Sequence, residues 1–188
     1  MCVDFPTSII AFSIGFMTGL LLINQKDIEK QSIGKFIICY SLIQLVEAGI
    51  HKYPDQKNLI ARLLPVLLAF QGVCFANLYR EMPRLLMMIF YLIFIFATIR
   101  ALSSKSIGVE IRNSIHWNFP SNINYPIGLM YVLIFLFIFS HFHTNSFTFR
   151  YGLIMLFTYV FSHIFKNVNR GSYWCMISAL GAPIALVI

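Results

Sequence analysis

Four polar side chains stand at helical spacing inside an apolar stretch of the sequence. Tyr40, Gln44, Glu47 and His51 follow one another at intervals of four, three and four residues, which places them on one face of an α-helix. If that helix crosses a bilayer, Glu47 lies about 6 Å below His51 at a rise of 1.5 Å per residue. A carboxylate at that depth costs a few kcal/mol unless it meets a partner, water or a proton. An acid, an amide and an imidazole in this position could bind a ligand or metal, or move a proton.

The composition excludes an ordinary soluble protein. Of 188 residues, 59% are hydrophobic and only 11% are charged, whereas soluble domains are about half apolar and a quarter charged. The net charge of +7 comes from Lys and Arg residues that lie almost entirely between apolar segments, where they would face lipid headgroups. We therefore predict one polytopic membrane domain over residues 1–188, with the lipid bilayer as its partner and no nucleic acid.

Apolar runs of membrane-spanning length alternate with short polar connections, which predicts an all-α bundle of about seven transmembrane helices. The predicted spans cover residues 7–24, 33–51, 59–79, 85–102, 126–142, 148–165 and 171–188. The fourth span carries almost no polar atom, so we expect it to face lipid. Ala11, Gly15 and Gly19 recur every four residues in the first span, a pattern typical of a close helix contact.

The connection between the fourth and fifth spans, residues 103–125, mixes apolar, aromatic and polar residues and contains His116 and Trp117. Such a composition is typical of a segment that lies in the membrane interface or folds back over the bundle. We therefore predict an interfacial or re-entrant segment here. Connections of this length are often functional.

Chemically versatile residues fall mostly toward one end of the predicted bundle, which we call face A, the end that holds the N-terminus. Gln71, in the third span, needs polar partners, and Gln44 or Glu47 could supply them. The candidate ligand-binding residues are Gln44, Glu47, His51, Gln71, His116, Trp117, His163, Trp174 and Cys175. Eight Lys and Arg residues fall toward face A and six toward the other end, so the positive-inside rule does not fix the orientation.

Four functions fit these residues. The leading interpretation is a non-catalytic protein that binds a small molecule or lipid in a polar pocket near face A, with aromatic walls from Trp117, Tyr159 and Trp174. Glu47 could instead conduct protons or ions. It could also share a metal with His51 in a membrane-embedded enzyme, with His116 or His163 as a further ligand. The fourth interpretation is a structural scaffold held by an interhelical hydrogen-bond network. No catalytic residue, resident metal or cofactor is assigned, and Cys39 and Cys74 are interpreted as packing residues.

Several short motifs together resemble a family of small, uncharacterised seven-span membrane proteins of giant DNA viruses, algae and other protists. The motifs are Met1-Cys2, the phrase at residues 41–47, Asn58, Phe70-Gln71, His116-Trp117 and the phrase at residues 171–178. Val3 and Gly72 depart from the family pattern, which tends to have tryptophan and proline there. The resemblance implies a seven-span fold in a host or virion internal membrane, and it emphasises Cys2, Gln44, Glu47, Gln71, His116, Trp174 and Cys175. It implies no particular activity.

Overall fold

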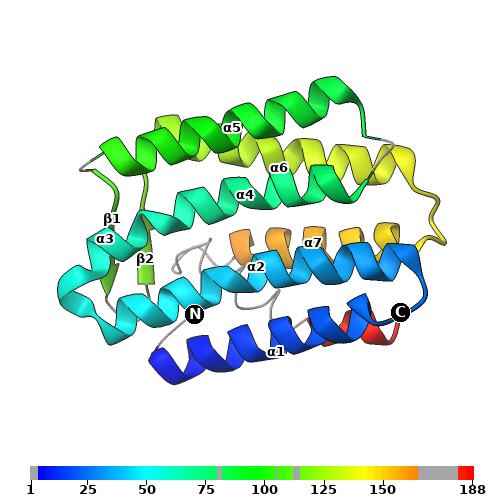
Figure 1. Cartoon of the computed structure of the whole chain (residues 1–188), viewed down its shortest axis with the longest axis horizontal. Coiled ribbons are helices and arrows are strands. Elements are labelled where there is room, and N and C mark those ends of the chain that lie inside the picture. The colour runs from blue at the N-terminus through cyan, green and yellow to red at the C-terminus, as the bar shows by residue number, and fades with distance from the viewer. Residues whose placement is uncertain (1–3, 80–81, 105, 112–114, 165–181) are drawn as a thin grey trace.

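The computed structural model describes residues 4–79, 82–104, 106–111, 115–164 and 182–188, and these residues are mostly helical (Figure 1). The long helices are α1 (Phe5–Ile23), α2 (Ile28–Lys52), α4 (Leu63–Leu78), α5 (Arg84–Ser103), α6 (Ser121–His141) and α7 (Phe147–Ile164). The shorter elements are η1 (Pro54–Gln56), α3 (Lys57–Ala61), β1 (Gly108–Ile111), β2 (Ile115–Asn118) and η2 (Ala182–Leu186).

Five helical segments in the described part are long and apolar enough to cross a membrane, with η1, α3 and α4 acting together as one segment over residues 54–78. This confirms the prediction of a helical, multi-pass membrane bundle, and each segment overlaps one of the first five predicted spans. The sixth predicted span coincides with α7. Residues 171–181 of the seventh lie outside the described residues, and the chain beyond them forms the short 3-10 helix η2.

The start of α2 shows why the length of an apolar run underestimates the length of the helix that contains it. The predicted span begins at residue 33, but α2 begins at Ile28, after Asp27. The Asp27 carboxylate accepts hydrogen bonds from the backbone N–H groups of Glu29 (2.8 Å) and Lys30 (3.4 Å), which satisfies donors that have no partner within the helix. The cap therefore sets the helix start, and charged residues fill its first turns.

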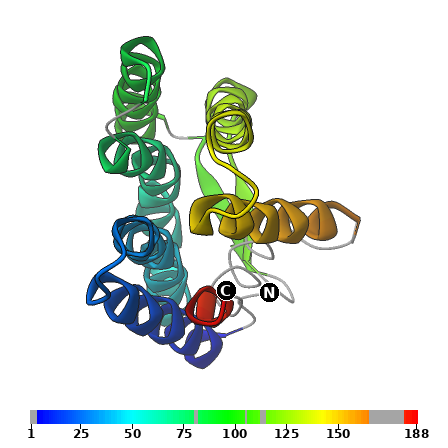
Figure 2. The ribbon, with the colours of Figure 1, turned by 90° about the vertical axis from the view of Figure 1, so that its right-hand side faces the viewer.

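The helices form two groups (Figure 2). Seen from the end of the bundle, α1, α2, α4 and α5 follow one another in a row, while α6 and α7 lie on one side of that row. The helix α7 is clearly inclined to the other long helices. The start of α1, the end of α2, α3 and the two strands all lie together at the left end of Figure 1, which corresponds to face A.

The first two helices pack closely because glycines meet at their contact. The buried residues of α1 include Ala11, Gly15 and Gly19, so this stripe faces the interior of the protein, and Gly19 contacts a neighbouring helix as predicted. A Cβ atom added at Gly19 would lie 2.7 Å from the carbonyl oxygen of Gly34 on α2, and one added at Gly34 would lie 2.7 Å from the carbonyl oxygen of Gly19. The two backbones therefore touch at a point that admits no side chain.

The outer helix α5 exposes an apolar face. Its large exposed residues recur every three or four positions, as Leu85, Met88, Leu92, Ile95, Ile99 and Leu102. A continuous apolar surface of this kind is unfavourable in water and favourable in lipid. This confirms the prediction that the span faces outward.

The connection between α5 and α6 contains an antiparallel hairpin of β1 and β2, in which Gly108 pairs with Asn118 and Ile111 with Ile115. The sequence pattern predicts an interfacial or re-entrant segment here and does not indicate strands. One face of the hairpin packs on the bundle, because Val109 and Ile115 are buried. The backbone N–H of Val109 also donates a hydrogen bond to Oδ1 of Asn58 at 3.2 Å. Asn58 lies in α3, just before the bend between α3 and α4. Asn58 thus holds β1 against the end of the bundle.

Candidate functional site under the hairpin

A buried carboxylate lies beneath the hairpin. Glu47 on α2 is completely buried, and the indole Nε1–H of Trp117 on β2 donates a hydrogen bond to its Oε1 at 3.0 Å. The two residues are 70 positions apart in the sequence. The sequence analysis selected both, and the structure brings them together.

The hairpin geometry explains why Trp117, and not its neighbour, reaches the carboxylate. Successive side chains of a strand point to opposite faces, so His116, which pairs with Glu110, lies on the other face of β2 from Trp117. The Trp117 ring also stacks on Phe119, with 5.8 Å between ring centroids. That stacking supports the orientation in which the indole N–H points toward α2.

A second buried polar contact joins α4 to α6. Gln71 is completely buried, and its Oε1 accepts a hydrogen bond from the hydroxyl of Tyr131. Within the described residues, Nε2 of Gln71 has no hydrogen-bond partner. The sequence analysis proposed Gln44 or Glu47 as partners of Gln71 and did not select Tyr131. A tyrosine in the middle of an apolar span is itself a signal, because a buried phenol usually has a hydrogen-bond partner.

Replacing Tyr131 with phenylalanine tests this contact. We expect Tyr131→Phe to lower the free energy of unfolding by about 1–3 kcal/mol, because a buried amide loses its hydrogen-bond donor. Thermal unfolding of the purified protein in detergent measures the change. The matched control is Tyr125→Phe on the same helix, where the side chain is 76% exposed; an equal loss in both variants would contradict a specific role for the Gln71 contact.

The remaining candidate residues divide into those that the structure places and those that it does not. Gln44 is fully buried on α2, and His51 is half-buried in the last turn of that helix. Asp4, at the start of α1, lies near this end too: hydrogen bonds from the Thr7 side chain and backbone lower the pKa of its carboxyl, and His51 contributes to the same shift. His163 lies in α7, but its side chain is not described, and Trp174 and Cys175 lie outside the described residues.

The described residues do not place a set of metal ligands together. Within them, no three His, Cys, Asp or Glu side chains are grouped closely enough to hold a metal ion. The metal hypothesis takes its third ligand from His116 or His163. His116 lies on the face of β2 opposite Trp117, and the side chain of His163 is not described.

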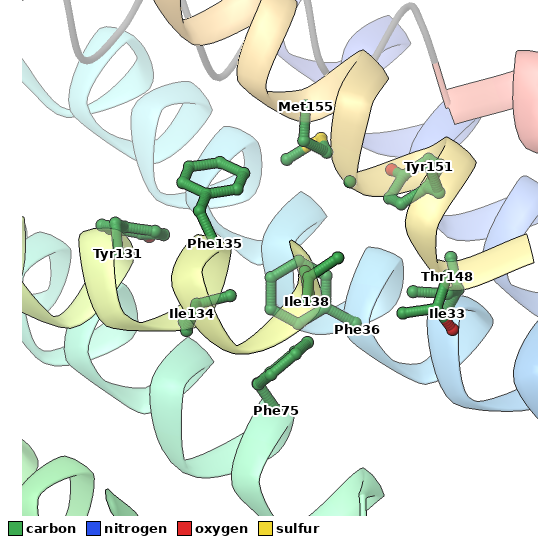
Figure 3. Close-up of a pocket in the computed structure, with 11 residues that line it drawn as sticks. Ile33, Phe36, Phe75, Tyr131, Ile134, Phe135, Ile138, Thr148, Tyr151 and Met155 are labelled. Atoms are coloured by element: carbon green, nitrogen blue, oxygen red, sulfur yellow. The ribbon is translucent and has the colours of Figure 1, made fainter. Parts of the chain in front are cut away.

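Two cavities lie away from Glu47. The first, of about 20 Å³, is surrounded by apolar side chains of α2, α4, α6 and α7, among them Phe36, Phe75 and Ile138 (Figure 3). It has room for about one water molecule, and its lining also includes the hydroxyl-bearing residues Tyr131, Thr148 and Tyr151. The second is an open groove of about 530 Å³ at the other end of the bundle, and its polar lining residues include Glu29, Ser32, Lys35, Asn77, Tyr79 and His141. Of these, the sequence analysis singled out none as a site residue.

Comparison of the chain with protein-family models, curated proteins and solved structures found no match.

Proposed function

We propose that this multi-pass membrane protein binds a small amphipathic molecule or lipid at Glu47, with the β1–β2 hairpin as a cover over the site. The observation that carries the proposal is the hydrogen bond from Trp117 to the fully buried Glu47 carboxylate. A buried carboxylate is costly, and here one of its hydrogen-bond donors comes from a hairpin that lies outside the helical bundle.

The chemistry of the contact indicates the class of ligand. An amine or hydroxyl group can donate to Glu47 in place of the indole, so that a ligand exchanges one hydrogen bond for another. An alkyl chain on the same ligand would suit the apolar helices below the hairpin. Two hydrogen bonds hold the hairpin on the bundle, one from Val109 to Asn58 and one from Trp117 to Glu47. Breaking the Trp117 hydrogen bond would open a path to the carboxylate.

The rest of the chain completes the proposal. We place Gln44, His51 and Gln71 near Glu47 as further polar groups, while His116 lies on the opposite face of β2 from Trp117. We also place α7 and residues 171–188 as sixth and seventh spans. These would bring His163, Trp174 and Cys175 toward the same end. The family resemblance supports a location in a host or virion internal membrane.

Trp117 provides the experiment, because the chain has only two tryptophans. In a Trp174→Phe background, the fluorescence of the protein in phosphatidylcholine nanodiscs reports on Trp117 alone. Dodecylamine should shift the emission saturably to longer wavelength, because the indole leaves the buried carboxylate for wetter surroundings. Dodecyltrimethylammonium carries the same charge and chain but no N–H donor, and should give no saturable shift.

Two variants decide whether Glu47 is the binding group. Glu47→Leu should abolish the response to dodecylamine, whereas Glu29→Gln, in the groove at the opposite end, should retain it. A response that persists in Glu47→Leu, or that both amphiphiles give equally, would overturn the proposal.

The buried hydrogen bonds of Glu47 and Gln71 also favour a second function, a structural scaffold in which these contacts only hold helices and hairpin together. A scaffold predicts no saturable amine response while the stability effects of Tyr131→Phe remain. The conduction alternative predicts proton flux through proteoliposomes that Glu47→Gln abolishes.

A further inference from the structure

Two cysteines meet between α2 and α4. Sγ of Cys39 lies 2.9 Å from Sγ of Cys74, although the residues are 35 positions apart. Both are free thiols and both are half-buried. A disulfide requires a sulfur separation of about 2.05 Å, so these sulfurs need to move together by only about 0.9 Å, the difference between the two distances.

We propose that Cys39 and Cys74 are a modification site, at which a hydroperoxide converts the two thiols into an interhelical disulfide. One thiol attacks the terminal oxygen of the peroxide, the O–O bond breaks, and the products are a sulfenic acid and an alcohol. The second thiol then attacks the sulfenic sulfur, the S–S bond forms, and the hydroxyl leaves with the thiol proton as water. The two thiols lose two electrons in total, and the peroxide gains them.

The position of the pair selects the kind of oxidant. Cys39 and Cys74 lie within the membrane-spanning segments that contain α2 and α4, so a peroxide that dissolves in lipid reaches them more readily than a charged oxidant does. Half-burial leaves part of each cysteine exposed at the surface of the bundle, while the contact between the two sulfurs keeps the resolving thiol in place.

The cross-link acts on the helices that carry the buried polar residues. Gln71 lies three residues before Cys74, which is about one helical turn on α4, and α2 carries Gln44 and Glu47. A covalent bond between the helices would fix the separation of these polar groups. The proposal about the thiols does not depend on ligand binding at Glu47.

The test oxidises the folded protein and identifies the bond. In a Cys2→Ser, Cys175→Ser background in nanodiscs, cumene hydroperoxide should lower the intact mass by two hydrogen atoms. Peptide mapping should then join the Cys39 and Cys74 peptides, and a reductant should restore both thiols. Persistence of two alkylatable thiols after treatment, or stable sulfinic acid in place of the cross-link, would overturn the proposal.

Matched variants keep the result specific. Cys39→Ser and Cys74→Ser should each leave one thiol that oxidises without losing the two hydrogen atoms. Moving the thiol to the lipid-facing position Leu45, which is 44% exposed, in a Cys39→Ser, Leu45→Cys variant should prevent cross-linking to Cys74. Equal cross-linking in that variant would show that helix mobility, and not the observed contact, brings the sulfurs together.

Discussion

Replacing Gly34 with leucine should prevent the chain from forming a monodisperse, folded bundle. A Cβ atom at Gly34 would lie 2.7 Å from the backbone oxygen of Gly19 and 2.8 Å from Cβ of Leu22. One is a backbone atom and the other is a Cβ atom fixed to the backbone, so both can move only if α1 itself moves. Overpacking of this kind costs about 1–3 kcal/mol or more, and leucine adds three further carbon atoms at the same contact.

The smaller substitution Gly34→Ala should destabilise the protein without preventing folding, and a glycine-to-alanine control elsewhere should not destabilise it. We expect Gly34→Ala to lower the free energy of unfolding by about 1–3 kcal/mol. At Gly128 on α6, an added Cβ would have no atom of another described element within 4 Å. Gly128→Ala should therefore be neutral or stabilising by about 0.5–1 kcal/mol, because alanine favours helix over glycine. Thermal unfolding followed by circular dichroism compares the two. Equal effects would show that helix propensity, and not the α1–α2 contact, determines the result.

The membrane helices could be predicted from the sequence because their signal is long and local. Each span is an apolar run of about 20 residues, and the small-residue stripe of α1 was correctly assigned to a helix contact. The strands were missed because β1 and β2 have only four residues each, which is too short to establish an alternating pattern. Helix starts were also displaced where a cap such as Asp27 precedes charged residues.

The residue pairs in contact at the site could not be predicted from the sequence, because a local pattern does not indicate which distant residue a side chain contacts. Glu47 and Gln71 could be selected from the sequence, since polar groups in an apolar span need partners. Trp117, which donates to Glu47, and Tyr131, which donates to Gln71, lie 70 and 60 residues away along the chain. The same holds for Cys39 and Cys74: each one alone indicates a packing residue, and only the packing of α2 on α4 brings the two sulfurs into contact.

Glu47→Lys should destabilise the protein far more than Glu47→Leu or Glu47→Gln. Lysine would place a cationic donor at a completely buried position that already faces the Trp117 N–H donor, and an uncompensated buried charge costs about 3–5 kcal/mol. Leucine removes the acceptor and leaves the indole N–H unpaired, at about 1–3 kcal/mol. Glutamine keeps a carbonyl oxygen for the indole and should have the smallest effect.

The control for lysine is a substitution at nearly the same depth on the same helix. Leu45 is 44% exposed, so in Leu45→Lys the charged end can extend toward the membrane interface, and the loss should be smaller than in Glu47→Lys. Thermal unfolding in detergent ranks the four variants, and emission of Trp117 in a Trp174→Phe background shows whether the indole keeps an acceptor. Equal losses in Glu47→Leu and Glu47→Lys would contradict a position defined by the Trp117 hydrogen bond. Equal losses in Leu45→Lys and Glu47→Lys would show that membrane depth alone sets the cost.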